Sequence, residues 1–157
     1  MSALLRAARA PPSLRARALA VLPRFLSAAS YPSDRKYKAS HEWAKLDGDV
    51  ATVGITDHAQ AALGDIVFAD LPEVGSEASA GERAATVESV KAAADIYAPL
   101  SGEVVGVNDS LDDSPDLINK TPHDDGWIFR IKVNDPAQID ALMDSADYEK
   151  TIAEEAE

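Results

Sequence analysis

From residue 41 onward, turn-forming residues divide the sequence into short runs that are typical of β-strands. The expected strands cover residues 41–46, 50–55, 65–71, 83–90, 95–98, 103–107 and 127–133. In the last run, the apolar side chains fall on one face and the basic ones on the other: Trp127, Phe129, Ile131 and Val133 against Arg130 and Lys132. Several short strands with few helices predict a mainly β fold, a sandwich or flattened barrel.

The expected helices are short and peripheral. Thr56 or Asp57 can cap a helical turn over residues 58–63, which Gly64 would end. Pro136 suits the first position of a second helix, and residues 147–157 predict a weaker C-terminal helix. The acidic stretch 108–125 is expected to be a solvated loop with one brief turn at residues 115–118.

Composition excludes several classes of function. The chain has 157 residues, which suits one domain plus an extension, and it has no cysteine. Disulfides, thiolate metal sites and a cysteine nucleophile are therefore excluded, and any dithiol must come with a cofactor. After residue 33, ten basic residues stand against all 27 acidic residues, a formal net charge of −17. Such a charge repels nucleic acid and anionic membranes, and favours partners with basic surfaces.

Residues 1–33 differ from the rest of the chain. They contain five arginines and no acidic residue, and are otherwise rich in Ala, Leu and Ser. This composition is typical of a mitochondrial transit peptide, which we expect to be disordered and removed between Arg24 and Asp34. A plain basic tail and a plastid-type transit peptide are the alternatives. No stretch in the chain has the roughly 20 apolar residues that a membrane span needs.

One lysine stands between two expected strands. Lys91 lies in the turn that follows residues 83–90, and Ala92, Ala93 and Ala94 beside it would not shield it. An isolated lysine is usually only solvated, and Glu88 would be a weak ion-pair partner. At the tip of a hairpin, however, this amine would be open to covalent modification.

The lysine motif and many other segments resemble those of the glycine cleavage system H protein, a lipoyl carrier. The motif consists of Glu88-Ser89-Val90-Lys91-Ala92 followed by Ala98-Pro99-Leu100-Ser101-Gly102. The other segments, in order, are Ser40-His41-Glu42-Trp43, Val53-Gly54-Ile55-Thr56-Asp57-His58, Leu63-Gly64-Asp65-Ile66, Leu71-Pro72-Glu73, Pro115-Asp116-Leu117-Ile118-Asn119 and Gly126-Trp127. The resemblance covers nearly all of the chain after residue 34. It implies that residues 34–157 form a lipoyl/biotinyl-carrier-like domain, a hybrid of flattened barrel and sandwich.

The resemblance also implies that the protein catalyses no reaction itself and instead carries a cofactor between enzymes. Lipoate would be amide-linked to Lys91 by lipoylating enzymes. The carrier would take the aminomethyl group of glycine from the decarboxylase (P protein) to the aminomethyltransferase (T protein), and electrons to dihydrolipoamide dehydrogenase (L protein). The mitochondrial matrix is the implied location. No catalytic residue and no metal ligand are expected.

Five further residues match functional positions of the family. Ser40, Glu42 and Asp95 match the contacts of the loaded arm's amine, and a hydroxyl with two carboxylates suits a cation. Glu88 and Gly102 match positions tied to recognition by lipoylating enzymes. Each of the first three could instead be an ordinary turn or surface residue. Gly102 could serve only the backbone shape of a turn.

Other interpretations remain open or fail. A lipoate relay protein, which passes its lipoyl group to other enzymes, would use the same lysine. A biotin carrier usually has methionines beside the lysine, where this chain has Val90 and Ala92. The three histidines are scattered along the chain, and His41-Glu42-Trp43 lacks the second histidine of a zinc helix. The aromatic side chains Trp43, Phe68, Trp127 and Phe129 are expected in the core.

Overall fold

The structure is a computed structural model that describes residues 31–155. The expected transit peptide therefore lies outside the described residues except for its last three positions. The compact unit discussed below begins at Pro32. Within the described part of the chain, no helix combines the length and apolar character needed to cross a membrane.

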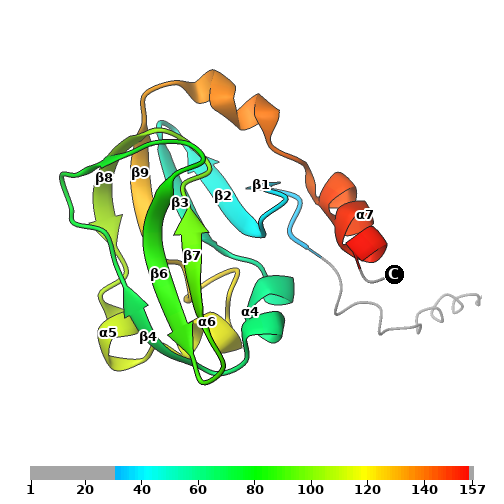
Figure 1. The fold of residues 1–157 in the computed structure, drawn as a ribbon. Helices are drawn as coiled ribbons and strands as arrows, with labels where there is room; N and C mark the ends of the chain where they lie inside the picture. Colours follow the sequence, from blue (N-terminus) through cyan, green and yellow to red (C-terminus); the bar gives the residue numbers. More distant parts are fainter. Residues whose placement is uncertain (1–30, 156–157) are drawn as a thin grey trace, which may run out of the picture. The chain divides into compact units, whose positions relative to one another are not determined.

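Short antiparallel strands dominate this unit (Figure 1). The strands are β1 (Lys36–Tyr37), β2 (Glu42–Asp47), β3 (Val50–Ile55), β4 (Ile66–Asp70), β5 (Glu77–Ala78), β6 (Arg83–Ser89), β7 (Ala93–Tyr97), β8 (Gly102–Val107) and β9 (Phe129–Val133). Six form one sheet in the order β1-β2-β3-β9-β8-β5, and the other three form a second sheet in the order β4-β6-β7. The predicted mainly β fold is confirmed.

Two tight hairpins follow the predicted turns. β2 and β3 pair with Asp47 opposite Val50, and Gly48 between them has φ 67°, a value that favours glycine. β6 and β7 pair with Glu88 opposite Ala93. The residues between these two strands form the turn that carries Lys91.

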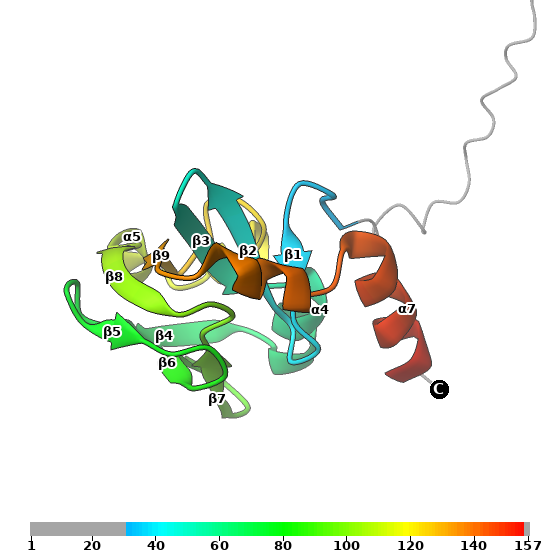
Figure 2. The same ribbon diagram turned by 90° about the horizontal axis from the view of Figure 1, so that it is seen from above.

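The core lies between the two sheets, which form separate layers in Figure 2. Val53 and Ile131 from the larger sheet, and Val87 and Ile96 from the smaller sheet, are at most 2% exposed. In β9 the buried and exposed residues alternate as predicted. Trp127 was expected in the core and in the same strand. Instead it precedes β9 and is half-buried. Its ring packs against the solvent-facing guanidinium of Arg130, which lies 4.0 Å from the ring centroid.

The helices are short, as predicted, and the longest is the C-terminal one. They are α4 (Asp57–Leu63), α5 (Ser110–Asp113), α6 (Leu117–Lys120), the 3-10 helix η2 (Pro136–Ala141) and α7 (Ser145–Glu155). Thr56 caps α4 by accepting a hydrogen bond from the backbone N–H of Ala59, and Gly64 ends it with φ 82°. The stretch 108–125 is more ordered than predicted, because buried Leu111 and Ile118 anchor its two helical turns.

A buried tyrosine attaches α7 to the rest of the unit. Tyr148 is fully buried and its ring stacks on Tyr37 at a centroid distance of 4.9 Å. Its hydroxyl lies 2.7 Å from the Thr56 hydroxyl at the start of α4. The C-terminal helix is therefore connected to both β1 and α4.

Candidate functional site

Figure 1 shows the hairpin that β6 and β7 form. Lys91 lies in its turn, beside α4. The backbone N–H of Ser89 donates to the carbonyl of Ala92 across the turn, at 2.8 Å. The Ser89 hydroxyl oxygen accepts hydrogen bonds from the N–H groups of Lys91 and Ala92, both at 3.1 Å. One serine side chain thus organises the turn, a role missed in the sequence although serine is favoured at the first position of such turns.

The Lys91 side chain is exposed and extends along α4. Its Nζ donates a hydrogen bond to the carbonyl of Ala62, at 3.1 Å. A Cβ atom added to Gly64 would lie 3.3 Å from Cδ of Lys91. Glycine at position 64 therefore allows the left-handed backbone that ends α4 and also leaves room for the lysine stem.

A pocket of about 380 Å³ lies between α4, β7 and the turn before β2, and we call it the α4 pocket. Its lining residues are Ser40, His41, Glu42, Ile55, His58, Ala59, Ala62, Leu63, Ala94, Asp95, Ile96 and Glu155. The structure thus brings the predicted residues Ser40, Glu42 and Asp95 into one pocket. Because Ala62 also accepts the hydrogen bond from Lys91, the lysine amine reaches the wall of this pocket.

Glu42 places a buried carboxylate in the wall of the α4 pocket. It is 1% exposed, and its two oxygens accept hydrogen bonds from the Ser40 hydroxyl at 2.5 Å and from the backbone N–H of Tyr97 at 3.0 Å. Burial raises the pKa of Glu42, although the hydrogen bonds from Ser40 and Tyr97 act in the opposite direction. A buried acid with no cation in hydrogen-bond contact among the described residues is suited to receive a cationic group.

Asp95 supplies a second carboxylate, from an exposed position on β7. It pairs with Thr86 on β6, whose hydroxyl donates to the carboxylate at 3.4 Å. Ser40 is also exposed, so its hydroxyl connects the buried Glu42 to the solvent side of the pocket.

Glu88 and Gly102 lie outside the α4 pocket. Glu88 is exposed on β6 opposite Phe68 of β4, and Phe68 is 50% exposed, so the prediction that Phe68 belongs to the core is wrong. A Cβ on Gly102 would lie 2.0 Å from the backbone carbonyl oxygen of Lys132 on the neighbouring strand β9. Close strand packing therefore requires glycine at position 102.

Two histidines meet at the other side of the α4 pocket. The rings of His41 and His58 are 4.7 Å apart between centroids, and the Glu155 carboxylate oxygen Oε1 is 3.2 Å from Nε2 of His41 and 3.7 Å from Nε2 of His58. The expectation that the histidines are scattered is therefore wrong for these two. Burial lowers the pKa of His41, Glu155 opposes this lowering, and His58 adds to it. His123 is elsewhere, accepting a hydrogen bond from the N–H of Asp57.

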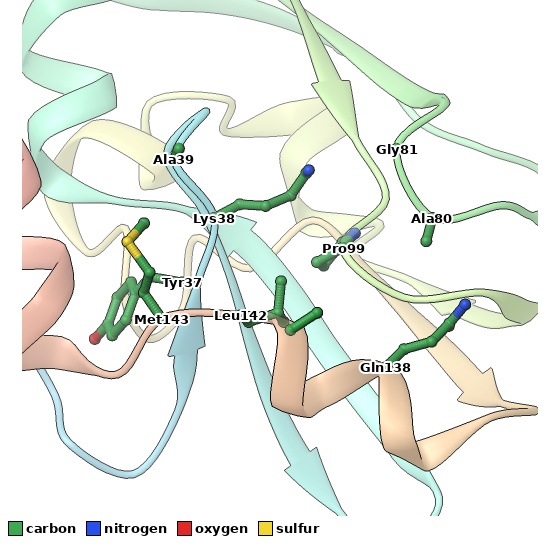
Figure 3. A pocket seen from close by; sticks show the side chains of 10 residues that line it. Tyr37, Lys38, Ala39, Ala80, Gly81, Pro99, Gln138, Leu142 and Met143 are labelled. Carbon is green, nitrogen blue, oxygen red and sulfur yellow. The ribbon is translucent and has the colours of Figure 1, made fainter.

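A second and larger pocket, about 520 Å³, lies beside η2, and we call it the η2 pocket. Figure 3 shows Lys38 and Gln138 among side chains that are mostly small or apolar. No carboxylate belongs to the described residues that line it: Tyr37, Lys38, Ala39, Ala80, Gly81, Pro99, Gln138, Ala141, Leu142 and Met143.

The fold and the α4 pocket define a class of protein. Two antiparallel sheets that project one lysine on a hairpin, beside a pocket with a buried acid, are typical of carriers that hold a covalently attached group.

Comparisons with known proteins identify the family. The family model for the glycine cleavage H-protein matches residues 35–155. The glycine cleavage system H protein of Sodalis glossinidius is 56% identical over 130 residues, covering 82% of this chain and 99% of that protein. The H protein of Pseudoalteromonas atlantica is 52% identical over 128 residues, covering 81% of this chain and 99% of that protein. The crystal structure of an H protein from Mycobacterium marinum superposes with a TM-score of 0.73 at 39% identity, covering 78% of this chain and 99% of that one.

The chain belongs to the glycine cleavage H-protein family. It is a non-catalytic lipoyl carrier that acts as a shuttle in glycine cleavage, and its cofactor is covalently attached lipoate. Interaction with the P, T and L proteins is a property of the family, and the relatives named above are bacterial.

Proposed function

We propose that Nζ of Lys91 is the amine to which lipoate is attached. The observation that carries this proposal is the hydrogen bond from Lys91 Nζ to Ala62, a residue of the α4 pocket. The pocket suits the group, because apolar Ile55, Leu63 and Ile96 can contact an alkyl chain while Glu42 offers a charge. When bound, lipoate supplies the disulfide that accepts the aminomethyl group and electrons.

Ser40, Glu42 and Asp95 are the residues proposed to bind the amine of the aminomethyl cargo. Glu42 is the principal one, since its carboxylate is buried and its interaction with a cation is little weakened by solvent. Ser40 donates to Glu42 and holds the carboxylate in place. Asp95 adds a second negative charge from the exposed side of the pocket.

Glu88 and Gly102 contribute to lipoylation in different ways. Glu88 is exposed on the strand that leads to Lys91, where a lipoylating enzyme can contact it directly. Gly102 acts through the spacing of β8 and β9, since the contact with Lys132 alone accounts for the need for glycine there.

The partners of this carrier are the three enzymes of glycine cleavage: the glycine decarboxylase, the aminomethyltransferase and dihydrolipoamide dehydrogenase. The formal charge of −17 after residue 33 would steer the carrier toward basic surfaces on these enzymes. Attachment to Lys91 makes each transfer local once a partner has docked, which raises the effective concentration of the reacting group.

Residues 1–33 are proposed to be a mitochondrial transit peptide, which places residues 34–157 in the mitochondrial matrix as the carrier domain. The arginine-rich, acid-free composition supports this, as does the start of the family match at residue 35.

One measurement tests the attachment site and the processing together. An intact-mass spectrum of the protein from its native source should show the mass of one lipoyl group and a new N-terminus between Arg24 and Asp34. Fragmentation should place the group on Lys91, and Lys91→Arg should abolish the modification and glycine oxidation, whereas Lys45→Arg should preserve both. Lipoyl found on another lysine, or glycine oxidation that survives Lys91→Arg, contradicts the proposal.

A further inference from the structure

We propose that His41, His58 and Glu155 bind a divalent transition-metal ion of the Zn²⁺ type, which fastens the C-terminal end of α7 to the wall of the α4 pocket. The three side chains come from separate elements: the turn before β2, the first turn of α4 and the last residue of α7. This site is independent of the lipoyl attachment proposed above, because it includes neither Lys91 nor a sulfur atom.

The distances suit zinc. Bonds of about 2.0–2.1 Å in a tetrahedral site put the ligand atoms about 3.3 Å from one another. Here Glu155 Oε1 lies 3.2 Å from His41 Nε2 and 3.7 Å from His58 Nε2, and the ligand atoms of all three residues lie within 4.8 Å of one another. Small movements of the exposed Glu155 and of the half-buried His58 ring would bring all three ligand atoms to this spacing. Two histidines and one glutamate form a three-ligand set that leaves a fourth position for water.

A second layer of contacts fixes the ring of His41. Its Nδ1 lies 2.8 Å from the hydroxyl of buried Tyr148, which in turn lies 2.7 Å from the Thr56 hydroxyl. A metal-binding histidine usually engages its other ring nitrogen in this way, which orients the ring and leaves Nε2 for the metal. When Nδ1 donates to Tyr148, neutral His41 presents a lone pair toward the Glu155 carboxylate, and a cation between them removes the repulsion.

The backbone at His41 is also held in an unusual conformation. His41 has φ 79°, and it is the one non-glycine residue with positive φ among those described. Its N–H donates to the carbonyl of Lys38 at 2.9 Å, and its carbonyl accepts from the N–H of Thr56 at 3.0 Å. These two bonds hold a conformation that is unfavourable for most side chains, in the orientation that turns the ring toward Glu155.

The experiment uses the full 157-residue chain without an affinity tag and with Lys91→Arg, so that no lipoyl sulfur can bind the metal. Calorimetric titration with Zn²⁺ should show one equivalent bound. Co²⁺ should give the visible absorption of a tetrahedral site, and NMR should show shifts of the ring signals of His41 and His58 but not of His123. Each of His41→Ala, His58→Ala and Glu155→Gln should weaken binding at least about tenfold.

Controls separate a metal site from general weakening of the fold. Glu154→Gln changes the neighbouring acid on the same helix and should bind as the parent does. Zn²⁺ should raise the melting temperature of the parent and of Glu154→Gln, but not that of Glu155→Gln, which measures binding to the folded state. The proposal is overturned if no Zn²⁺ binds, if several weak equivalents bind, or if binding persists in the two histidine variants.

Discussion

The two pockets of this carrier differ in what their walls contain, not only in size. The η2 pocket, at about 520 Å³, is larger than the α4 pocket, at about 380 Å³. Yet the η2 pocket has Lys38 and no carboxylate among its described lining residues, whereas the α4 pocket has Glu42, Asp95 and Glu155. The smaller pocket also contains the residue that Lys91 contacts. Charge and access to the hairpin, rather than volume, distinguish the proposed cargo site from the η2 pocket.

The largest expected difference between the pockets concerns retention of the cargo. Glu42→Ala should speed loss of the aminomethyl group from isolated, loaded protein by about tenfold to a hundredfold, since a hydrogen bond to a charged group contributes about 1.5–3 kcal/mol. The measurement is the rate at which labelled one-carbon unit leaves the loaded protein.

Two comparisons make this result specific. The extent of lipoylation, read by mass, should not change in Glu42→Ala, because Lys91 lies on a different turn. Gln138→Ala, a substitution in the η2 pocket, should leave the release rate as it is. An unchanged release rate in Glu42→Ala would show that the buried carboxylate does not hold the cargo.

The next largest effect concerns the β6–β7 hairpin, which carries Lys91 beside the α4 pocket. Ser89→Ala removes the hydroxyl that accepts from the N–H groups of Lys91 and Ala92, so the turn should become less ordered. Loss of about 0.5–1.5 kcal/mol of ordering should slow lipoylation about twofold to tenfold. Initial rates of lipoyl transfer to the unmodified protein measure this.

A matched serine provides the control for Ser89→Ala. The Ser76 hydroxyl donates to the carbonyl of Glu73 in another exposed turn. Ser76→Ala should be lipoylated at the parental rate. Equal rates in all three proteins would mean that the shape of the turn does not matter to the lipoylating enzyme.

The sequence predicted local structure better than long-range contacts. The strand at residues 50–55 agrees with β3, because a glycine turn marks where it begins. The hairpin around Lys91 was predicted from the two extended runs on either side of the lysine. β5 was missed because its two residues form a strand only by pairing with β8.

The site was predictable in part. The resemblance named Glu42, but sequence patterns could not show that its carboxylate is almost completely buried. The meeting of His41 with Glu155 joins residues more than a hundred positions apart, so no spacing rule finds it. Phe68 was misjudged because the alternation of β4 is broken between Ile66 and Phe68, where the register shifts as in a β-bulge. Ile66 and Ala69 are therefore buried, while Phe68 is exposed.

A smaller effect comes from the η2 pocket and concerns only stability. Gln138 accepts a hydrogen bond from the N–H of Ser101 at 2.8 Å and donates to the Ser101 hydroxyl at 3.3 Å. Gln138→Ala should lower the free energy of unfolding by about 1 kcal/mol, without altering lipoylation or retention of the cargo. Chemical denaturation measures the first quantity. If Gln138→Ala is fully folded and still loses lipoylation, the η2 pocket affects more than stability, and the proposed difference between the two pockets is wrong.

The smallest expected effect is a change in how stability depends on pH. Burial raises the pKa of Glu42 above its ordinary value of 4.5, so the folded protein binds this proton more readily than the unfolded chain. The stability that this group contributes is therefore fully present below about pH 4.5 and is lost as pH rises through the raised pKa. Glu42→Gln does not titrate, and its amide can still accept from Tyr97 and donate to Ser40. The free energy of unfolding of Glu42→Gln, relative to the parent, should thus increase from pH 4 to pH 7. If the difference in free energy of unfolding between Glu42→Gln and the parent stays constant over this range, the α4 pocket does not disfavour the charged form of Glu42. The buried carboxylate would then not distinguish the α4 pocket from the η2 pocket.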